Sequence, residues 1–316
     1  MSAGWCAGWP AGNEETVVDE EPGVVVRLMG GLGNQLFQFA AGCAVARERG
    51  RELFVYEDTN ADFSRFIQSG LHPATKRMVD RLVLNFCERP SLLSRGLWEL
   101  RAHVFKADPR YFTFRQEDSF GGRDDERLFR HKGLLGMTGY FQNPEWYEPV
   151  LDEVLQILRS AVASVVRPQE RTFRDELGDY TALSFRRGDY LRLGWSLPID
   201  YYESALKALP KSDGPLVLLS DDGLVADFAA QWAQAKGFDV IPDSVLGKRS
   251  RQRDLALLAD ASQVVMSNST FCWWGTVLGD DSVERNDHTR FVVAPRAWIP
   301  EYALSPRLLR PQWLAL

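Results

Sequence analysis

In the second half of this chain, short apolar runs alternate with helical segments, and this order restricts the fold more than any other feature of the sequence. Five strands are predicted, at 180–185, 216–219, 238–241, 263–267 and 290–294. The helices predicted between them are 200–209, capped by Asp200 with Glu203 in the capping-box position, then 223–236, 251–261 and 271–278. Strands separated in this way pair in parallel, with helices on both faces. The sequence therefore predicts an α/β domain.

The first half of the chain begins with the same order. An apolar run at 24–29 enters a glycine turn that contains Gly31 and Gly33. A helical pattern follows and stops at Gly50, the residue type that suits the left-handed position after a helix. Further strands are predicted at 52–57 and 137–142, and a helix at 148–165, whereas the region between the strands shows no clean period.

The glycine turn is itself a candidate ligand site. Glycine lets a backbone approach a ligand closely, and the start of a helix offers free N–H groups. A dinucleotide-binding turn of the G-x-G-x-x-G type would carry a third glycine, which is missing here. Glu57 and Asp58 stand near the position of the acidic residue that such a site requires, so a nicotinamide enzyme stays open as an alternative.

Polar residues gather where three of the predicted strands end. In a parallel sheet the carboxyl ends of the strands share one edge, and ligands bind there. The residues at this edge are Arg186, Arg187 and Asp189 after the first strand, Ser220, Asp221 and Asp222 after the second, and Asn268, Ser269 and Thr270 after the fourth. Their convergence predicts a binding site in the second half of the chain.

The adjacent guanidinium groups of Arg186 and Arg187, the arginine pair, are suited to a doubly charged phosphate, since arginine presents a planar fork of donors. An ordinary surface ion network is the alternative for this pair. Ser269 and Thr270 can face a phosphate or simply cap the next helix. For Trp273 and Trp274 the sequence favours a place in the core.

Composition and charge exclude several classes of protein. A formal net charge of -6 leaves no global positive field to attract nucleic acid. The four cysteines and four histidines lack metal-ligand spacing, so no metal is expected. We also expect no transmembrane segment, and a cytoplasmic protein, because the chain shows neither a long apolar stretch nor a signal peptide.

A length of 316 residues suits two domains. We expect a flexible leader at 1–22, an N-terminal domain at 23–167 and a C-terminal domain at 168–316.

Several motifs, taken in order, resemble the alpha-1,2-fucosyltransferases of glycosyltransferase family 11. They are Gly31-Leu32-Gly33-Asn34-Gln35-Leu36-Phe37-Gln38, Gly139-Tyr140-Phe141-Gln142, Arg186-Arg187-Gly188-Asp189-Tyr190, Asp200-Tyr201-Tyr202, Ser220-Asp221-Asp222 and Asn268-Ser269-Thr270-Phe271-Cys272-Trp273-Trp274-Gly275. The resemblance implies a GT-B-like fold, in which two Rossmann-like domains enclose a cleft. It also implies a galactoside alpha-1,2-fucosyltransferase that inverts the fucose anomeric carbon, takes GDP-fucose as donor and a galactose-terminated oligosaccharide as acceptor, and needs no metal or other cofactor.

Roles carry over from the family by position. The C-terminal domain would bind the donor, with Arg186 and Arg187 at the pyrophosphate and with Ser269, Thr270 and Phe271 near the phosphates and the fucose; Asn268 belongs to the same block. Gly31, Gly33, Asn34 and Gln35 would form the acceptor-side loop. Arg187, Asn34 and Asp189 are the candidate catalytic residues, although Asp189 can equally orient Arg187 or cap the turn. Asp222 can bind ribose or begin a helix, and Asp254 is a candidate at the guanine side.

The chain departs from the family pattern at one position. Ser184 stands where His-x-Arg-Arg-x-Asp has its histidine, and a serine can neither carry charge nor stack. Recognition of the base can therefore differ, which keeps open a transferase for another nucleotide sugar and a non-catalytic binding homologue. The acceptor is expected at the cytoplasmic face of a membrane, and no motif specifies an oligomeric state.

Overall fold

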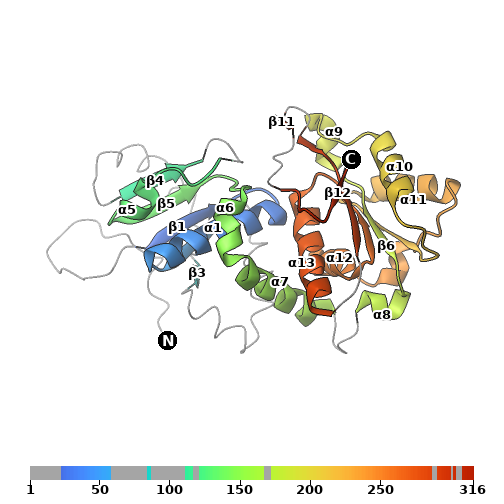
Figure 1. Ribbon diagram of the computed structural model, residues 1–316, viewed down its shortest axis with the longest axis horizontal. Helices are drawn as coiled ribbons and strands as arrows, with labels where there is room; N and C mark the ends of the chain where they lie inside the picture. The colour runs from blue at the N-terminus through green and yellow to red at the C-terminus, as the bar shows by residue number, and fades with distance from the viewer. Residues whose placement is uncertain are drawn as a thin grey trace. The chain divides into compact units, whose positions relative to one another are not determined.

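The computed structural model describes residues 23–57, 84–86, 111–116, 121–166, 172–286, 290–299, 302–303 and 308–316. These residues pack into two compact units, one running to Leu151 and the other beginning at Asp152 (Figure 1). The predicted boundary between the domains is 167–168, which places the helix α7 Leu151–Val166 in the first domain, whereas the structure places it in the second unit. The predicted leader, 1–22, lies outside the described residues.

The first unit holds a five-stranded parallel sheet in the order β3-β2-β1-β5-β4. Its strands are β1 Val24–Leu28, β2 Leu53–Glu57, β3 Leu84–Phe86, β4 Tyr111–Arg115 and β5 Leu134–Thr138. Its helices are α1 Leu32–Arg49, α5 Arg127–Arg130 and α6 Pro144–Tyr147, followed by the 3-10 turn η2 Glu148–Val150. Helix α1 ends as predicted, because Gly50 takes a left-handed φ of 61°.

The second unit holds another five-stranded parallel sheet, in the order β12-β9-β8-β6-β7. Its strands are β6 Thr181–Ser184, β7 Leu216–Leu219, β8 Gln263–Val265, β9 Phe291–Ala294 and β12 Leu314–Ala315, while β10 Ala297–Ile299 and β11 Tyr302–Ala303 form a separate antiparallel pair. Its helices are α7 Leu151–Val166, α8 Phe173–Leu177, α9 Gly188–Leu193, α10 Ile199–Ala208, α11 Gly223–Ala235, η3 Asp243–Leu246, α12 Arg251–Asp260 and α13 Thr270–Asn286. Two Rossmann-like units are thus confirmed, and the cleft expected of a GT-B-like fold stays a prediction.

Two details of the predicted alternation were wrong. The segment 238–241 makes only a bridge from Val240 to Leu216, because Pro242 follows at once and has no N–H to continue the ladder. The fifth strand of the sheet is instead β12. Helix α10 begins after Pro198, without a side-chain cap, and the Glu203 carboxylate lies 2.8 Å from Lys236 Nζ rather than in a capping box.

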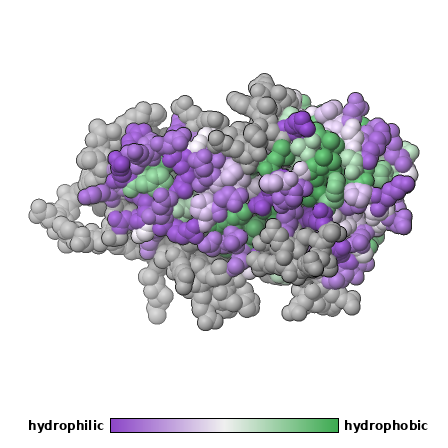
Figure 2. Space-filling model, in the orientation of Figure 1, coloured by the Kyte–Doolittle hydropathy of each residue, from purple (hydrophilic) through white to green (hydrophobic). Residues whose placement is uncertain are grey.

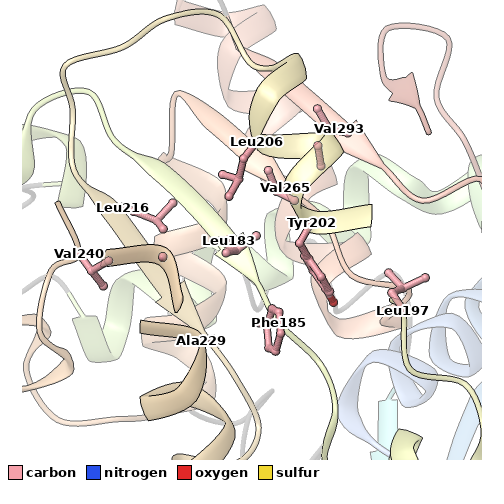
Figure 3. Close-up of a cluster of buried hydrophobic side chains, with 12 residues drawn as sticks. Leu183, Phe185, Leu197, Tyr202, Leu206, Leu216, Ala229, Val240, Val265 and Val293 are labelled. Carbon is pink, nitrogen blue, oxygen red and sulfur yellow. The ribbon is translucent and has the colours of Figure 1, made fainter. Parts of the chain in front are cut away.

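The core of the second unit lies where β6 and its neighbours meet α10 and α11. Figure 3 shows Leu183 of β6, Val265 of β8 and Tyr202 of α10 among the buried side chains that meet there. Phe185, the first residue after β6, is fully buried, with its ring centroid 4.4 Å from that of Tyr202. The chain is therefore held firmly on both sides of the point where β6 ends.

Helices α12 and α13 approach each other closely at Gly275. The neighbouring Trp273 and Trp274 are buried, as the sequence predicted. A Cβ atom at Gly275 would lie 2.8 Å from Leu258 Cβ. Figure 2 shows hydrophilic residues along the outer edge of the second unit and a group of hydrophobic residues on the face turned to the viewer.

We predict that Gly275→Ala destabilises the protein. Alanine would favour the helix by up to about 1 kcal/mol, but the overpacked contact with buried Leu258 should cost about 1–3 kcal/mol. Urea unfolding should show a lower midpoint. Gly223→Ala, at the open start of α11 with no atom within 4 Å of the added Cβ, is the matched control and should leave the midpoint unchanged or raise it. Equal midpoints for the two variants would contradict this packing account.

Candidate functional site

The arginine pair lies in the turn that joins β6 to α9. Arg186 and Arg187 are both half-buried, and Gly188 begins the helix immediately after them. A Cβ atom at Gly188 would lie 2.6 Å from Asp221 Oδ2, so the close approach of the segment after β7 requires glycine. Two of the three predicted strand-end groups therefore meet, as expected of neighbouring parallel strands.

Arg186 is held by charge and by an aromatic ring. Its Nη2 donates to Asp189 Oδ1 at 2.9 Å, and its Nε lies 3.2 Å from Asp221 Oδ2. The guanidinium also lies 4.7 Å from the centroid of the Tyr190 ring. Burial raises the pKa of Tyr190, and the positive charge of Arg186 opposes that rise. Asp189 therefore orients Arg186, and not Arg187 as the sequence suggested.

Arg187 differs from its neighbour. Within the described residues its side chain makes no hydrogen bond or ion pair, and its Nε is buried without a partner. A buried guanidinium N–H without an acceptor is costly, so an anion bound here would gain a strong, charge-assisted partner. Of the pair, Arg187 is the guanidinium whose donors are open to a ligand.

Ser184 closes β6 and is 8% exposed. Its hydroxyl lies 2.8 Å from that of Ser267, which follows β8 and is fully buried. Cys272 lies beside them; burial raises the pKa of its thiol, and contacts with Ser184 and Ser267 oppose the rise. The serine at the family's histidine position thus ties two strand ends together.

The segment after β8 is buried more deeply than the turn after β6. Asn268 and Ser269 are buried, and Thr270 begins α13 with Phe271 half-buried behind it. Asn268 Nδ2 donates to two backbone oxygens, those of Trp195 at 2.8 Å and Trp298 at 2.7 Å. This use of the amide was not predicted, because partners far away along the chain leave no local pattern.

The two other carboxylates named from the sequence have structural partners. Asp222 Oδ1 accepts from the N–H groups of Leu224 and Val225, so this residue caps α11. Asp254 Oδ1 accepts from Arg253 Nε at 3.0 Å. Burial raises the pKa of Asp254, and the Arg253 charge opposes the rise. A ribose or guanine contact by either carboxylate stays a prediction.

The glycine turn of the first unit leads from β1 into α1. Gly31 precedes the helix without a side-chain cap, and Gly33 is buried in its first turn. Asn34 Oδ1 accepts from Gln142 Nε2 at 3.2 Å, which joins two of the motifs. Gln35 Nε2 donates to the Gly30 oxygen, whereas the buried Gln35 Oε1 has no hydrogen-bond partner among the residues that the structure describes.

Two glutamines that were not singled out as site residues fix the backbone around this turn. The Gln38 amide bonds both the N–H and the oxygen of Met29, at 2.8 and 3.2 Å. Gln116 Oε1 accepts from the N–H of Phe141 at 2.6 Å, and Phe141 has a φ of 52°, which is uncommon for a residue other than glycine. Gln38 lies inside a quoted motif, but Gln116 carried no sequence signal.

Neither a metal cluster nor a membrane-spanning helix is found within the described ranges. No three His, Cys, Asp or Glu side chains lie together as a metal site would require. No helix has both the length and the apolar character that crossing a bilayer demands. Cys43 and Cys272 are buried thiols, whereas Cys6 and Cys87 lie outside the described residues.

Two parallel sheets of Rossmann type carry cationic and hydroxyl side chains after β6 and β8, at the edge where such sheets bind ligands. In a comparison with known proteins, the model of glycosyl transferase family 11 matches residues 135–290, which include the arginine pair and the segment 268–275. The resemblance given by the motifs is thereby confirmed for this region.

Two relatives from Escherichia coli match nearly the whole chain. The O-antigen biosynthesis glycosyltransferase WbnK is 23% identical over 318 residues, covering 92% of this chain and 99% of that one. An alpha-1,2-colitosyltransferase is 22% identical over 297 residues, covering 89% and 94%. Among solved structures, fucosyltransferase NodZ from Bradyrhizobium is 16% identical with a TM-score of 0.46, over 82% of this chain and 92% of that chain.

The serine pair Ser184 and Ser267 gives a direct test of the site's geometry. We predict that Ser184→Ala lowers the free energy of unfolding by about 1–3 kcal/mol, because it leaves the buried Ser267 hydroxyl without its partner. Ser267→Ala should do the same. The double variant should cost little more than either single one, since removing both partners leaves no orphan. Additive losses in urea unfolding would contradict the pairing.

Proposed function

We propose that this protein transfers L-fucose from GDP-fucose to the 2-hydroxyl of a terminal galactose, with inversion at the fucose anomeric carbon and without a metal. The observation that carries the proposal is the Arg187 side chain, half-buried after β6 and without a partner in the described part of the chain. The alpha-1,2 linkage named for one E. coli relative supports the same linkage here.

The arginine pair supplies the charge that this reaction needs. When the bond between the sugar carbon C1 and the phosphate oxygen breaks, its electron pair stays on GDP and negative charge grows on the diphosphate. Donors fixed in advance bind this growing charge more strongly than the ground state, which lowers the barrier. Arg187 would bind the diphosphate directly. Arg186, fixed by Asp189 and Asp221, would add its positive charge beside it.

The acceptor hydroxyl attacks the opposite face of the sugar and must lose its proton. Asp189 is the carboxylate we assign as the base: it is 46% exposed, and one oxygen accepts from Arg186. In the first unit we assign Asn34 and Gln35 to orient the substrates, with Gln142 fixing the Asn34 amide. Gly31 and Gly33 let the backbone of this loop approach a sugar closely.

The remaining donor contacts fall to the segments after β7 and β8. We assign Ser269, Thr270 and Phe271 to the phosphates and the fucose, and Asp222 and Asp254 to the ribose and the guanine. Ser184 would shape the base side of the site only through its bond to Ser267. The name of one relative, a colitosyltransferase, supports a second candidate: the same reaction with another nucleotide sugar as donor.

The direct test is turnover of GDP-fucose with lactose in the presence of EDTA, following GDP release and the product by mass spectrometry. Fucosylated lactose would support the donor, the reaction class and the absence of a metal requirement together. Thermal stabilisation by a different nucleotide sugar, with none by GDP-fucose, would favour the second candidate. Donor binding without transfer or hydrolysis, across a panel of galactose-terminated acceptors, would indicate a non-catalytic homologue.

Arg187→Ala should reduce turnover by a factor of about 100 or more, because it removes a preorganised donor to the leaving group. Circular dichroism and the thermal midpoint should stay close to the wild-type values, since the side chain has no partner within the described residues. Arg192→Ala, an exposed arginine on the same helix α9, is the matched control and should keep its turnover. Near-normal turnover by Arg187→Ala would contradict the role given to this residue.

A further inference from the structure

Trp195 lies in the segment between α9 and α10, and it contacts a ring that also contacts Arg186. Its backbone N–H donates to the Tyr190 oxygen at 2.9 Å, and its ring meets that of Tyr190 edge to face at 5.7 Å. The other neighbour of the Tyr190 ring is the Arg186 guanidinium, 4.7 Å from its centroid. The Arg186 guanidinium, the Tyr190 ring and the Trp195 indole are thus in contact one after another.

The backbone of Trp195 is also held by a side chain from the segment after β8. Asn268, 1% exposed at the end of β8, donates one amide bond to the Trp195 oxygen and one to the Trp298 oxygen. Both bonds are short, and both come from Nδ2, so the amide has no donor left for a ligand. Asn268, which the sequence placed among the donor-binding residues, therefore acts here by holding Trp195.

Two further aromatic residues, Tyr201 and Tyr202, follow Trp195 closely in the chain. The structure separates these residues. Tyr202 is fully buried in the core, and Tyr201 packs against it while its hydroxyl donates to the Met266 oxygen at 2.7 Å. Trp195 is outside that core cluster and keeps part of its surface exposed.

We propose that the Trp195 indole packs against the apolar face of the sugar carried by the donor diphosphate, and that Asn268 is its positioning residue. This inference rests on the proposed function. In the donor, the sugar is bonded directly to the diphosphate that the arginine pair would bind. The Tyr190 ring contacts both the Trp195 ring and the Arg186 guanidinium, so a single ring separates Trp195 from the pair. A 6-deoxyhexose presents a methyl group and a face of C–H bonds, which aromatic surfaces bind well.

The experiment compares the affinities of the full chain for GDP and for GDP-fucose by titration calorimetry. Trp195→Ala should weaken GDP-fucose binding by about tenfold, which corresponds to about 1.4 kcal/mol, and should leave GDP binding within about twofold of wild type. Phe228→Ala removes an aromatic ring, 50% exposed on α11 of the same unit, and should change neither affinity.

Asn268→Ala should cause the same selective loss, and the double variant with Trp195→Ala should lose little more than Trp195→Ala alone. A lower thermal midpoint is expected of either role, because the variant leaves the Trp195 and Trp298 oxygens without this donor. Equal weakening of GDP and GDP-fucose binding would show a purely structural role for Asn268 and would overturn its assignment. Equal weakening of both ligands by Trp195→Ala would place the indole at the nucleotide, and no change in either would remove it from the donor site. Each of these two results would overturn the proposal. Wild-type protein that binds neither ligand would overturn the proposed function and this inference with it.

Discussion

Strand β6 is buried along its whole length between β7 and β8, and the candidate site of the second unit depends on where this strand ends. Leu183 and Phe185 are both buried in the core, which fixes the point at which the chain leaves the sheet. The arginine pair follows directly. Parallel strands end at the same edge, so the pairing of β6 with β8, which stops at Leu183 and Val265, leaves the two strand ends side by side, and there the Ser184 hydroxyl lies 2.8 Å from that of Ser267.

The charges at this edge are divided unequally. Arg186 faces two carboxylates and a ring, whereas Arg187 has no partner in the residues described, so the local positive charge available to a ligand comes mainly from Arg187. A protein with a formal net charge of -6 does not attract anions as a whole. Selectivity for a phosphate-bearing ligand would therefore have to come from this short turn and from the hydroxyl groups of Ser269 and Thr270 after β8.

Apolar runs gave reliable predictions wherever the strand was buried on both faces. Strand β7 lies at the predicted 216–219, and β6, β8 and β9 lie within a few residues of their predicted positions. Strand β12 was missed because two residues, Leu314 and Ala315, form no recognisable run. The residues named from the sequence after β6, β7 and β8 do lie at the ends of these strands, but their individual contacts were not predicted. The bonds from Asn268 to Trp195 and Trp298 depend on tertiary packing, which no local pattern records.

A crystal structure with GDP would test the central claim most directly, because two different turns compete for a diphosphate. The account predicts the diphosphate oxygens within hydrogen-bond distance of the Arg187 guanidinium, with Arg186 still held by Asp189 and Asp221. A diphosphate bound instead at the uncapped start of α1, against Gly31, would contradict it. That result would move the nucleotide to the first unit and would revive the dinucleotide-type alternative.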